Sequence, residues 1–546
     1  MISPEPPPGR DARGDSAGRR TPLCHAAGLT AALSIAVFVA APWLDQGLVW
    51  SAWVGVAAAL LLVDRFRGWW GECLILTGAT VAIALAFHWT PEALAVAMAA
   101  DQTVGLAIAA PIVLWDALRL AMPFWFVGRV ERDPLRAWLP AATLAVAIEA
   151  IMPAVFPWKL GYSQIAWPAV VQSADVLGPE GPTFMLFAHA GAIAWLVHAG
   201  LTLVRRDTEK LPARVRLPAA SGLALLVCIA NLLYGTAAMM HWQHRAHEAP
   251  TIRLAIVQAN PGEGDGVDGL RTLTRRIAGE TSSRQPDLVC WPECSGGCYA
   301  DTLDSLADPD RVLELSRAPN AGLRPLENPG CPLLFGGKIY CGHPDRPRAI
   351  HQSAILIDTA EKIVGRYHKR YLMPFGEYVP GDDWFPDIRR SFAMQEEFTE
   401  GIEPTVLACG SRARVGAMLC YEDMVPSAAR SLAAASANLF VSLINGAAFP
   451  QPLTLAQHRL LSQLRAVESR RCLVRCAATG ETCVISPVGT ITASLPPRTR
   501  GVLTADVPLI ESLTIATWAG GAFPLACALA AARFAARPRR IGWPPV

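Results

Sequence analysis

Charged residues are scarce in this sequence. Asp, Glu, Lys and Arg make up 17% of the 546 residues, whereas hydrophobic residues make up 52% and the mean hydropathy is positive at +0.29. A chain this apolar is not an ordinary soluble enzyme, and its length leaves room for two or more domains. An excess of positive charge is also missing, because the formal net charge is +2 and the basic residues fall in short clusters between apolar runs. The net charge therefore gives no indication of a nucleic-acid partner, and we predict none.

Patterns that bind metal ions are missing as well. Cys290, Cys294 and Cys298 are closely spaced, but neither a matching Cys-x-x-Cys pair nor a group of histidines accompanies them. We therefore predict no metal site and no cofactor. Ten of the 14 cysteines lie between residues 290 and 483. If Cys420 is kept free, nine remain, so at least one more is unpaired, and one or two disulfides stay open.

The apolar residues are concentrated in residues 27–240, which consist mostly of Ala, Leu, Val, Ile and Trp. Runs of about 17 to 25 apolar residues are long enough to cross a bilayer. We place such spans near residues 26–43, 48–63, 71–89, 104–127, 138–156, 182–204 and 217–240, with an eighth near 512–532. The predicted organisation is a disordered tail at 1–22, a transmembrane domain with seven spans at 23–245, a globular domain at 246–510, and a last span with a basic tail at 511–546.

Basic loops predict the orientation of these spans, because loops rich in Arg and Lys stay in the cytoplasm. The tail, the loops at 64–70, 128–136 and 205–216, and the C-terminus are basic, whereas the loops at 44–47 and 90–103 contain no Lys or Arg. Eight spans then alternate consistently, with both termini inside and residues 241–511 outside. In a Gram-negative-type cell, this is a multi-pass protein of the inner membrane with its globular domain in the periplasm.

Two features of the membrane half suggest function. Glu149 lies inside the fifth span, where an ionisable group is costly and is a functional candidate by default. A structural ion pair with another helix is the alternative. The segment Phe156–Gln164 follows it and reads Phe-Pro-Trp-Lys-Leu-Gly-Tyr-Ser-Gln, an aromatic and polar loop at the outer interface, although its Trp and Tyr could serve only as interfacial anchors.

Residues 250–508 alternate charged and apolar residues, as a globular domain does. Strands are predicted at 252–258, 287–291, 332–340, 350–358, 413–420, 438–444 and 482–486, with helices near 267–283, 426–436 and 453–471. Strands that alternate with helices indicate a layered α/β domain. The helix at 453–471 carries a polar face that we expect to be solvated, formed by Gln457, His458, Arg465, Glu468, Arg470 and Arg471.

Three residues of this domain share one setting in the sequence. Glu293 follows an apolar strand, Cys420 ends another, and Lys369 follows a third. A thiol nucleophile needs a base, and the tetrahedral intermediate of acyl transfer needs a cation or a donor for its oxyanion. Taken singly, each residue has a structural explanation: a turn acid, a surface lysine and a core cysteine. Together and in this order they predict an acyl-transfer site.

The motifs Trp291-Pro-Glu293, Tyr367-His-Lys369 and Cys420-Tyr-Glu422 resemble the Glu-Lys-Cys site of the nitrilase (carbon-nitrogen hydrolase) superfamily. The stretch Met373–Pro380, the segment Phe156–Gln164 and the eight predicted spans are similar, more narrowly, to the apolipoprotein N-acyltransferase family. Soluble nitrilases have neither the spans nor the Phe-Gly-Glu-Tyr-Val-Pro stretch. The resemblance covers nearly the whole chain beyond the tail.

This resemblance implies an αββα sandwich that rests on the outer leaflet. It implies Glu293 as the general base, Cys420 as the nucleophile and Lys369 as the oxyanion stabiliser. Glu377 would be a second acid near the base, and Tyr421 and Glu422 would shape the site, with Glu149 as further support. The implied reaction takes an acyl chain from a phospholipid onto the thiol and then onto the α-amino group of a diacylglyceryl-cysteine lipoprotein. The implied partners of this monomer are the phospholipid donor, the lipoprotein acceptor and the membrane.

The chain also departs from the family. Asn445-Gly-Ala-Ala-Phe449 keeps Asn and Phe but lacks the Asp and Trp that many members carry there, a difference that bears on lid packing and acyl-chain choice. Two alternatives stay open at this point. A membrane-tethered amidase of the nitrilase type would use the same three residues but resolve the acyl-enzyme with water. A non-catalytic membrane scaffold is the other, against which the retention of all three residues argues.

Overall fold

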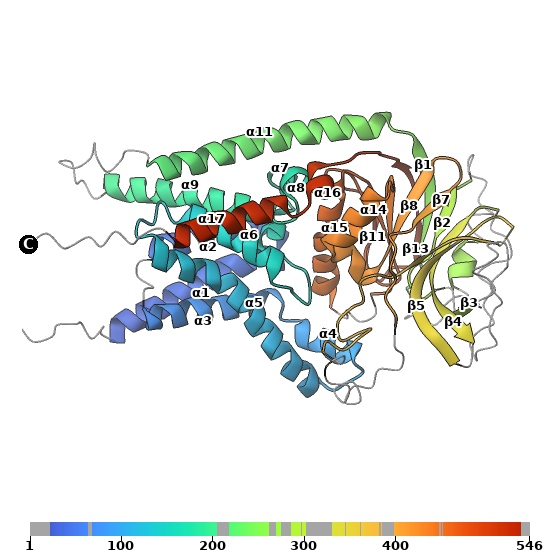
Figure 1. Cartoon of the computed structure of the whole chain (residues 1–546), viewed down its shortest axis with the longest axis horizontal. Coiled ribbons are helices and arrows are strands. Elements are labelled where there is room, and N and C mark those ends of the chain that lie inside the picture. Colours follow the sequence, from blue (N-terminus) through green and yellow to red (C-terminus); the bar gives the residue numbers. More distant parts are fainter. Residues whose placement is uncertain are drawn as a thin grey trace, which may run out of the picture.

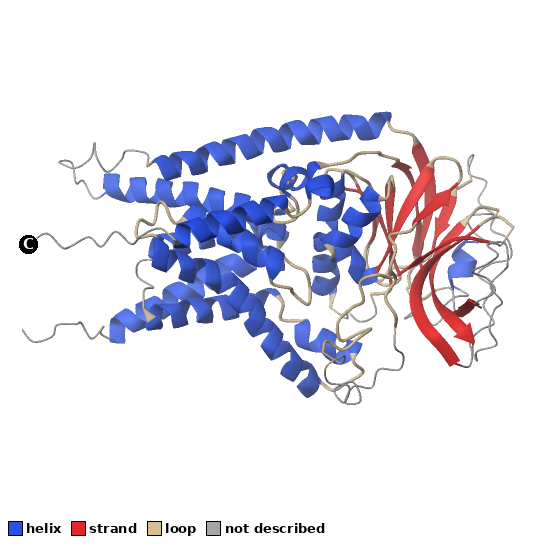
Figure 2. Ribbon diagram, viewed as in Figure 1, coloured by secondary structure: helices blue, strands red, loops and turns tan. Residues whose placement is uncertain are grey.

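The computed structural model describes residues 22–63, 68–204, 218–260, 269–274, 285–295, 298–301, 330–343, 346–360, 362–381, 384, 398–446, 449 and 451–536. A bundle of helices fills one end of the molecule and two β-sheets fill the other (Figure 1, Figure 2). The helix α11 (Ala219–Glu248) runs along one side from the bundle to the first strand (Figure 1). Two further helices, α14 (Pro426–Ala434) and α15 (Pro452–Ser469), lie between the bundle and the sheets.

The bundle contains a helix at each of the eight predicted spans. Five of them, in the described part of the chain, are long and apolar enough to cross a membrane: α1 (Pro22–Leu44), α3 (Trp69–Ala86), α5 (Gln102–Val130), α9 (Gly181–Val204) and α11. Three are shorter: α2 (Val49–Leu62), α6 (Trp138–Ile151) and α17 (Ala522–Ala535). The helical membrane domain is thus confirmed, whereas the number of spans stays a prediction.

Several helix ends differ from the predicted boundaries; α11, for example, continues to Glu248 where the span was predicted to end at 240. The fifth span was predicted to reach residue 156, but α6 ends at Ile151 because Met152 is extended and Pro153 follows it. The last span was predicted to begin at residue 512, but α17 begins at Ala522. Gly520 and Gly521 separate it from the short helix α16 (Ile515–Ala519), and Gly521 has a φ of +90°. Three other short helices lie between the long helices of the bundle and the globular domain: α4 (Thr90–Ala97), α7 (Pro168–Val171) and α8 (Ala174–Leu177).

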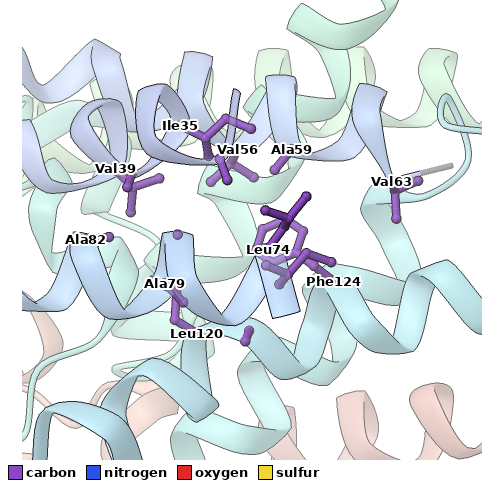
Figure 3. A pocket seen from close by; sticks show the side chains of 15 residues that line it. Ile35, Val39, Val56, Ala59, Val63, Leu74, Ala79, Ala82, Leu120 and Phe124 are labelled. Carbon is purple, nitrogen blue, oxygen red and sulfur yellow. The ribbon is translucent and has the colours of Figure 1, made fainter. Parts of the chain in front are cut away.

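Small residues allow the first helices to pack closely. A Cβ at Gly55 of α2 would lie 3.0 Å from the side chains of Phe38 and Val39 on α1, so the two helices approach without side chains between them. An apolar pocket of about 60 Å³ remains between α1, α2, α3 and α5 (Figure 3). Its labelled lining side chains, such as Leu74 and Phe124, carry only carbon. This pocket therefore offers no group for chemistry and is a packing void.

The globular domain is built on two sheets. One has the strand order β13-β1-β2-β4-β5-β6, with β3 also paired to β4, and the other has the order β12-β11-β10-β9-β8-β7. The strands of the first sheet are β1 (Thr251–Gln258), β2 (Leu288–Cys290), β3 (Cys298–Asp301), β4 (Leu333–His343), β5 (Arg346–Ile357), β6 (Ile363–His368) and β13 (Gly501–Pro508). Those of the second are β7 (Val406–Cys409), β8 (Ala413–Leu419), β9 (Leu439–Ile444), β10 (Leu473–Ala477), β11 (Thr482–Ile485) and β12 (Ile491–Leu495).

The two sheets pack face to face. One continuous core contains Leu254 and Leu356 of the first sheet together with Val415 and Val441 of the second. Helical residues 269–274 cover the outer face of the first sheet through Leu270, and α14 and α15 cover the second (Figure 2). The predicted layered α/β domain is therefore confirmed. The sequence pattern missed β3, β6, β7, β10, β12 and β13, several of which are short or partly exposed.

The polar face of α15 is buried, so the prediction of a solvated face was wrong. Arg465 and Arg470 are 0% exposed, because this face lies against the membrane domain rather than water. Gln457 accepts a hydrogen bond from the Trp89 indole (2.8 Å) and donates to the carbonyls of Trp43 and Ala86. The pattern of charged residues was read correctly, but their surroundings were not.

Two buried arginines, Arg465 of α15 and Arg470 directly after it, have partners in the membrane domain. Arg465 donates to the Tyr162 hydroxyl (2.8 Å) and pairs with Glu468 (2.8 Å). Arg470 pairs with Asp175 (2.8 Å) and donates to Gln172. Because a buried charge is costly unless it is paired, these contacts tie the catalytic half to the membrane half in one orientation.

A second buried network holds the turn after β8. Asp423 accepts hydrogen bonds from Arg475 of β10 (2.6 Å), His458 of α15 (2.8 Å) and Ser442 of β9 (2.8 Å). Burial alone would raise the pKa of Asp423, but Arg475 and His458 outweigh it and lower the pKa. The carboxylate is thus charged and joins three elements to the turn.

We expect Arg475→Met to destabilise the protein, because it leaves the Asp423 carboxylate buried without its main counter-charge. Breaking such a pair costs about 3–5 kcal/mol. The melting temperature in detergent, followed by tryptophan fluorescence, should fall by at least about 5 °C. Arg412→Met is the matched control, since Arg412 is exposed. Equal melting temperatures for the two variants would contradict the assigned role of the pair.

Candidate functional site

Glu293 lies in a turn directly after β2. Two backbone hydrogen bonds hold this turn against the neighbouring strand β4. Ser295 donates to the Gly336 carbonyl (3.0 Å), and Gly336 donates to the Pro292 carbonyl (3.3 Å). A Cβ at Gly336 would lie 2.6 Å from the Glu293 Cα, so a residue without a side chain is needed there. The Glu293 carboxylate also accepts a hydrogen bond from the Asn445 backbone. The Glu293 carboxylate is thereby fixed near the carboxyl end of β2, in the first sheet.

Lys369 follows β6 and lies between two carboxylates. Its Nζ is 3.3 Å from Glu293 and 2.7 Å from Glu377, and its side chain is 1% exposed. Glu377 is held in turn, because its second carboxylate oxygen accepts from the Met373 backbone (2.8 Å). Burial works against the lysine charge, but the two carboxylates outweigh it and raise the pKa of Lys369 well above its usual range. Lys369 is therefore a permanent cation.

Cys420 lies at the end of β8, in the second sheet, where the chain turns into a 3₁₀ helix (Cys420–Met424). Its φ of +48° is unusual for a residue with a side chain and costs about 1–3 kcal/mol. Burial raises the pKa of its thiol well above the ordinary value, and Glu293 adds to this while Lys369 opposes it. The resting thiol is thus neutral and needs a base before it can attack.

Glu422 connects the lysine to the cysteine. One of its oxygens accepts from the Tyr367 hydroxyl (2.7 Å) and the Arg370 backbone (2.7 Å), on either side of Lys369. The other accepts from the Leu419 backbone (2.9 Å), directly before Cys420. Burial raises its pKa to about 7, although these donors oppose the shift. Glu422 thus acts on the site through position rather than by contact with a reacting atom.

The surroundings of Glu293 make its carboxylate a better proton acceptor. Burial raises the pKa of Glu293, the neighbouring Glu377 raises it further, and Lys369 opposes both. A carboxylate with a raised pKa is a better proton acceptor at neutral pH than an ordinary one. The three predicted residues therefore form one electrostatic unit, with an acid, a cation and a thiol from three strand ends.

Tyr421 and Glu149 lie where the membrane domain meets this site. The Tyr421 hydroxyl donates to the Val155 carbonyl (2.8 Å), beyond the end of α6. Glu149 accepts from the Leu160 backbone (2.8 Å), and Lys159 donates to its carbonyl (2.9 Å), so Glu149 supports the loop that follows α6. A cavity of about 420 Å³ lies between these parts and is lined by Glu149, Trp158, Tyr371, Tyr378 and Tyr421, among others. This cavity lies between the membrane domain and the turn that contains Tyr421.

Comparison with known proteins agrees with this architecture. Residues 253–513 match the carbon-nitrogen hydrolase family, and residues 35–192 match the apolipoprotein N-acyltransferase N-terminal domain. An apolipoprotein N-acyltransferase of Geobacter metallireducens is 27% identical over 510 residues, which cover 92% of this chain and 93% of that protein. One of Caulobacter vibrioides is 29% identical over 461 residues, or 82% of this chain and 78% of that protein. The chain belongs to the apolipoprotein N-acyltransferase family.

The family is thus represented in both halves of the chain. Among solved structures, Nit3 of Saccharomyces cerevisiae, of the nitrilase superfamily, is 19% identical, with a TM-score of 0.35, over 50% of this chain and 94% of that chain. The predicted membership of the apolipoprotein N-acyltransferase family is confirmed.

The cysteines near Glu293 differ in their surroundings. Cys290 is a buried free thiol between the two sheets, where its carbonyl accepts a weak hydrogen bond from Cys476 (3.4 Å). Cys294 is exposed and unpaired, with a φ of +60°. The side chain of Cys298 lies outside the described residues. None of Cys290, Cys294, Cys420 and Cys476 forms a disulfide.

Sequence reasoning missed two contributors to the site. The backbone donor of Asn445 left no signal, because any residue type can supply an N–H group. The Asp423 network was visible only as an acid beside Cys420 and an arginine in Leu473-Val-Arg475, which lie 52 residues apart in the chain. Neither could be assigned before the strands were placed side by side.

We expect Glu377→Gln to shift the pH dependence of Cys420 acylation. We expect Glu293 to act as a base in its ionised form, so activity should be lost as the pH falls through its pKa. The negative charge of Glu377 raises the pKa of Glu293, so removing it should lower this pKa. Glu293 then becomes the only carboxylate of the two that pairs with Lys369. The acid limb of kcat/KM should therefore move to lower pH, measured with an acyl p-nitrophenyl ester.

Glu403→Gln is the control for this measurement, since Glu403 is exposed. Its acid limb should coincide with that of the unchanged protein. An acid limb of Glu377→Gln that stays in place or moves to higher pH would refute the coupling of the two carboxylates.

Proposed function

We propose that this protein is an apolipoprotein N-acyltransferase that moves an acyl chain from a phospholipid, through a thioester on Cys420, to the N-terminal amino group of a diacylglyceryl-cysteine lipoprotein. The observation that carries the proposal is the position of Glu293, Lys369 and Cys420 in a family member whose catalytic turn is hydrogen-bonded to the membrane domain. Such a site has a nucleophile for acyl groups and direct access to lipid.

The first half-reaction forms the thioester. Glu293 takes the proton of the Cys420 thiol, and the thiolate attacks the ester carbonyl of the phospholipid. Lys369 stabilises the oxyanion with its fixed positive charge. As the intermediate collapses, the carbon–oxygen bond breaks and Glu293 returns the proton to the leaving glycerol oxygen, so a lysophospholipid departs.

The second half-reaction uses the same groups. The α-amino group of the lipoprotein attacks the thioester carbonyl, Glu293 takes the proton of the attacking nitrogen, and Lys369 again stabilises the oxyanion. The carbon–sulfur bond breaks, and the thiolate recovers the proton through Glu293. An amide and the free thiol result, and the kinetics are ping-pong.

The location follows from the substrates. Both are lipids, and each buried CH₂ group holds them in the bilayer by about 0.8 kcal/mol. We therefore propose that the enzyme is a monomer of the bacterial inner membrane whose catalytic domain faces the periplasm. The basic loops support this orientation.

The experiment is an acylation assay with the full chain in detergent. Purified protein is incubated with phospholipid and a diacylglyceryl lipopeptide, and the mass of the lipopeptide is followed. We expect a gain of one acyl chain, which is lost in Cys420→Ala because no thioester can form. Released fatty acid without this gain would point to hydrolysis instead, and no turnover by a folded protein would refute an enzymatic function.

A further inference from the structure

A second cavity lies on the membrane side of the site. It has a volume of about 740 Å³, within the range of ligand-binding cavities. Its walls come from the end of α6, the residues around α8, the start of α14, and the α16–α17 segment. Figure 1 shows α8, α14 and α16 side by side, between the helical bundle and the sheets. The proposed mechanism has not used this cavity.

Arg430 of α14 lines this cavity without a partner. Among the residues that the structure describes, none accepts a hydrogen bond from its guanidinium or forms an ion pair with it. The acids nearby are already paired, because Glu180 binds Lys159 (2.8 Å) and Glu468 binds Arg465 (2.8 Å). The cavity therefore contains a guanidinium whose donors are not used by the described residues, although Arg430 is close enough to Glu468 for their charges to interact.

The chain makes space for this side chain at the Gly520–Gly521 break. A Cβ at Gly520 would collide with the Arg430 guanidinium, so the glycine allows the arginine to lie against the backbone between α16 and α17. The guanidinium is only half-buried and faces the cavity. A planar fork of donors in such a setting is suited to phosphate oxygens.

The rim of the cavity indicates a lipid occupant. Trp518 and Ile515 of α16 are 78% and 55% exposed, and Leu525 of α17 is 62% exposed. α17 is one of the shorter apolar helices of the membrane domain, and the proposed orientation puts its start, which lines the cavity, at the level of the lipid headgroups. Exposed Trp at this level is typical of the membrane interface. An amphipathic ligand would place its tails on this rim and its polar group inside.

The cavity also continues toward the nucleophile. It shares Ile151, Lys159 and Pro426 with the 420 Å³ cavity that Tyr421 lines. Tyr421 follows Cys420 directly in the chain. A lipid held by its headgroup in the outer cavity could therefore extend its ester region toward the thiol.

We propose that Arg430 binds the phosphate of the acyl-donor phospholipid in this cavity. This inference rests on the proposed function and deepens it by naming the donor site. The charge assigns the cavity to the donor rather than the acceptor, because a diacylglyceryl lipopeptide carries no phosphate. Arg430 is a positioning residue, since it binds a part of the substrate remote from the reacting carbonyl.

The test compares two acyl donors in mixed detergent micelles, with intact mass of the full-length protein reporting acylation of Cys420. One donor is a phospholipid and the other is an acyl p-nitrophenyl ester, which has no phosphate. We expect Arg430→Gln to raise KM for the phospholipid on the order of tenfold or more, because a charge-assisted phosphate contact is lost. Acylation by the p-nitrophenyl ester should be unchanged.

Three further variants sharpen the comparison. Arg430→Lys keeps the charge and should recover part of the affinity for phospholipid. Gly520→Ala leaves Arg430 in the sequence but displaces its side chain, so it should show the same donor-selective loss. Arg412→Gln removes an exposed arginine of the same domain and should behave as the unchanged protein with both donors.

The outcomes separate the two proposals. An unchanged KM for phospholipid in Arg430→Gln, or an equal loss with both donors, would overturn the phosphate site while leaving the proposed function in place. If the unchanged protein accepts an acyl group from the p-nitrophenyl ester but never from phospholipid, the proposed function fails and this inference fails with it.

Discussion

The structure depends on the burial of charged groups along one face of α15. Arg465 and Arg470 have no access to water, so protein groups must satisfy them, chiefly Tyr162 and Glu468 for Arg465 and Asp175 and Gln172 for Arg470. Lifting the catalytic domain from the helices would separate Arg470 from Asp175 and Gln172, and Arg465 from Tyr162. The position of the sheets relative to the helical bundle is therefore fixed. A domain that only needed a tether could have relied on a flexible linker.

Because the two domains are fixed relative to each other, the turn at Cys420–Met424 keeps the same contacts on every side. Tyr421 is held by the loop after α6, Glu422 by the strands around Lys369, and Asp423 by α15 and β10. Three consecutive residues thus reach three different parts of the molecule. The unusual backbone of Cys420 is sustained by these neighbours, because strain persists only where the surroundings over-determine it. The thiol is presented at one place, between the acid of one sheet and the membrane domain.

Much of the site could be predicted because strand ends leave a signature in the sequence. Glu293 and Cys420 each follow an apolar run, Lys369 follows β6, and the ends of strands in packed sheets can meet at one edge. The surroundings of α15 could not be predicted in the same way. A face with Gln457, Arg465 and Arg470 has the same pattern whether it meets water or another domain, since periodicity reports which residues share a face and not what covers it. Short strands such as β7 and β10 were missed because few residues carry their pattern.

The departure of this chain from its family after β9 has a limited effect on the chemistry for a physical reason. Asn445 reaches Glu293 through its backbone, and an N–H group is supplied by any residue except proline. Phe449 still packs against Trp89 and Phe156, with ring centroids 6.2 and 6.3 Å away. The contact with Glu293 and the aromatic contact with the membrane domain are thus both kept.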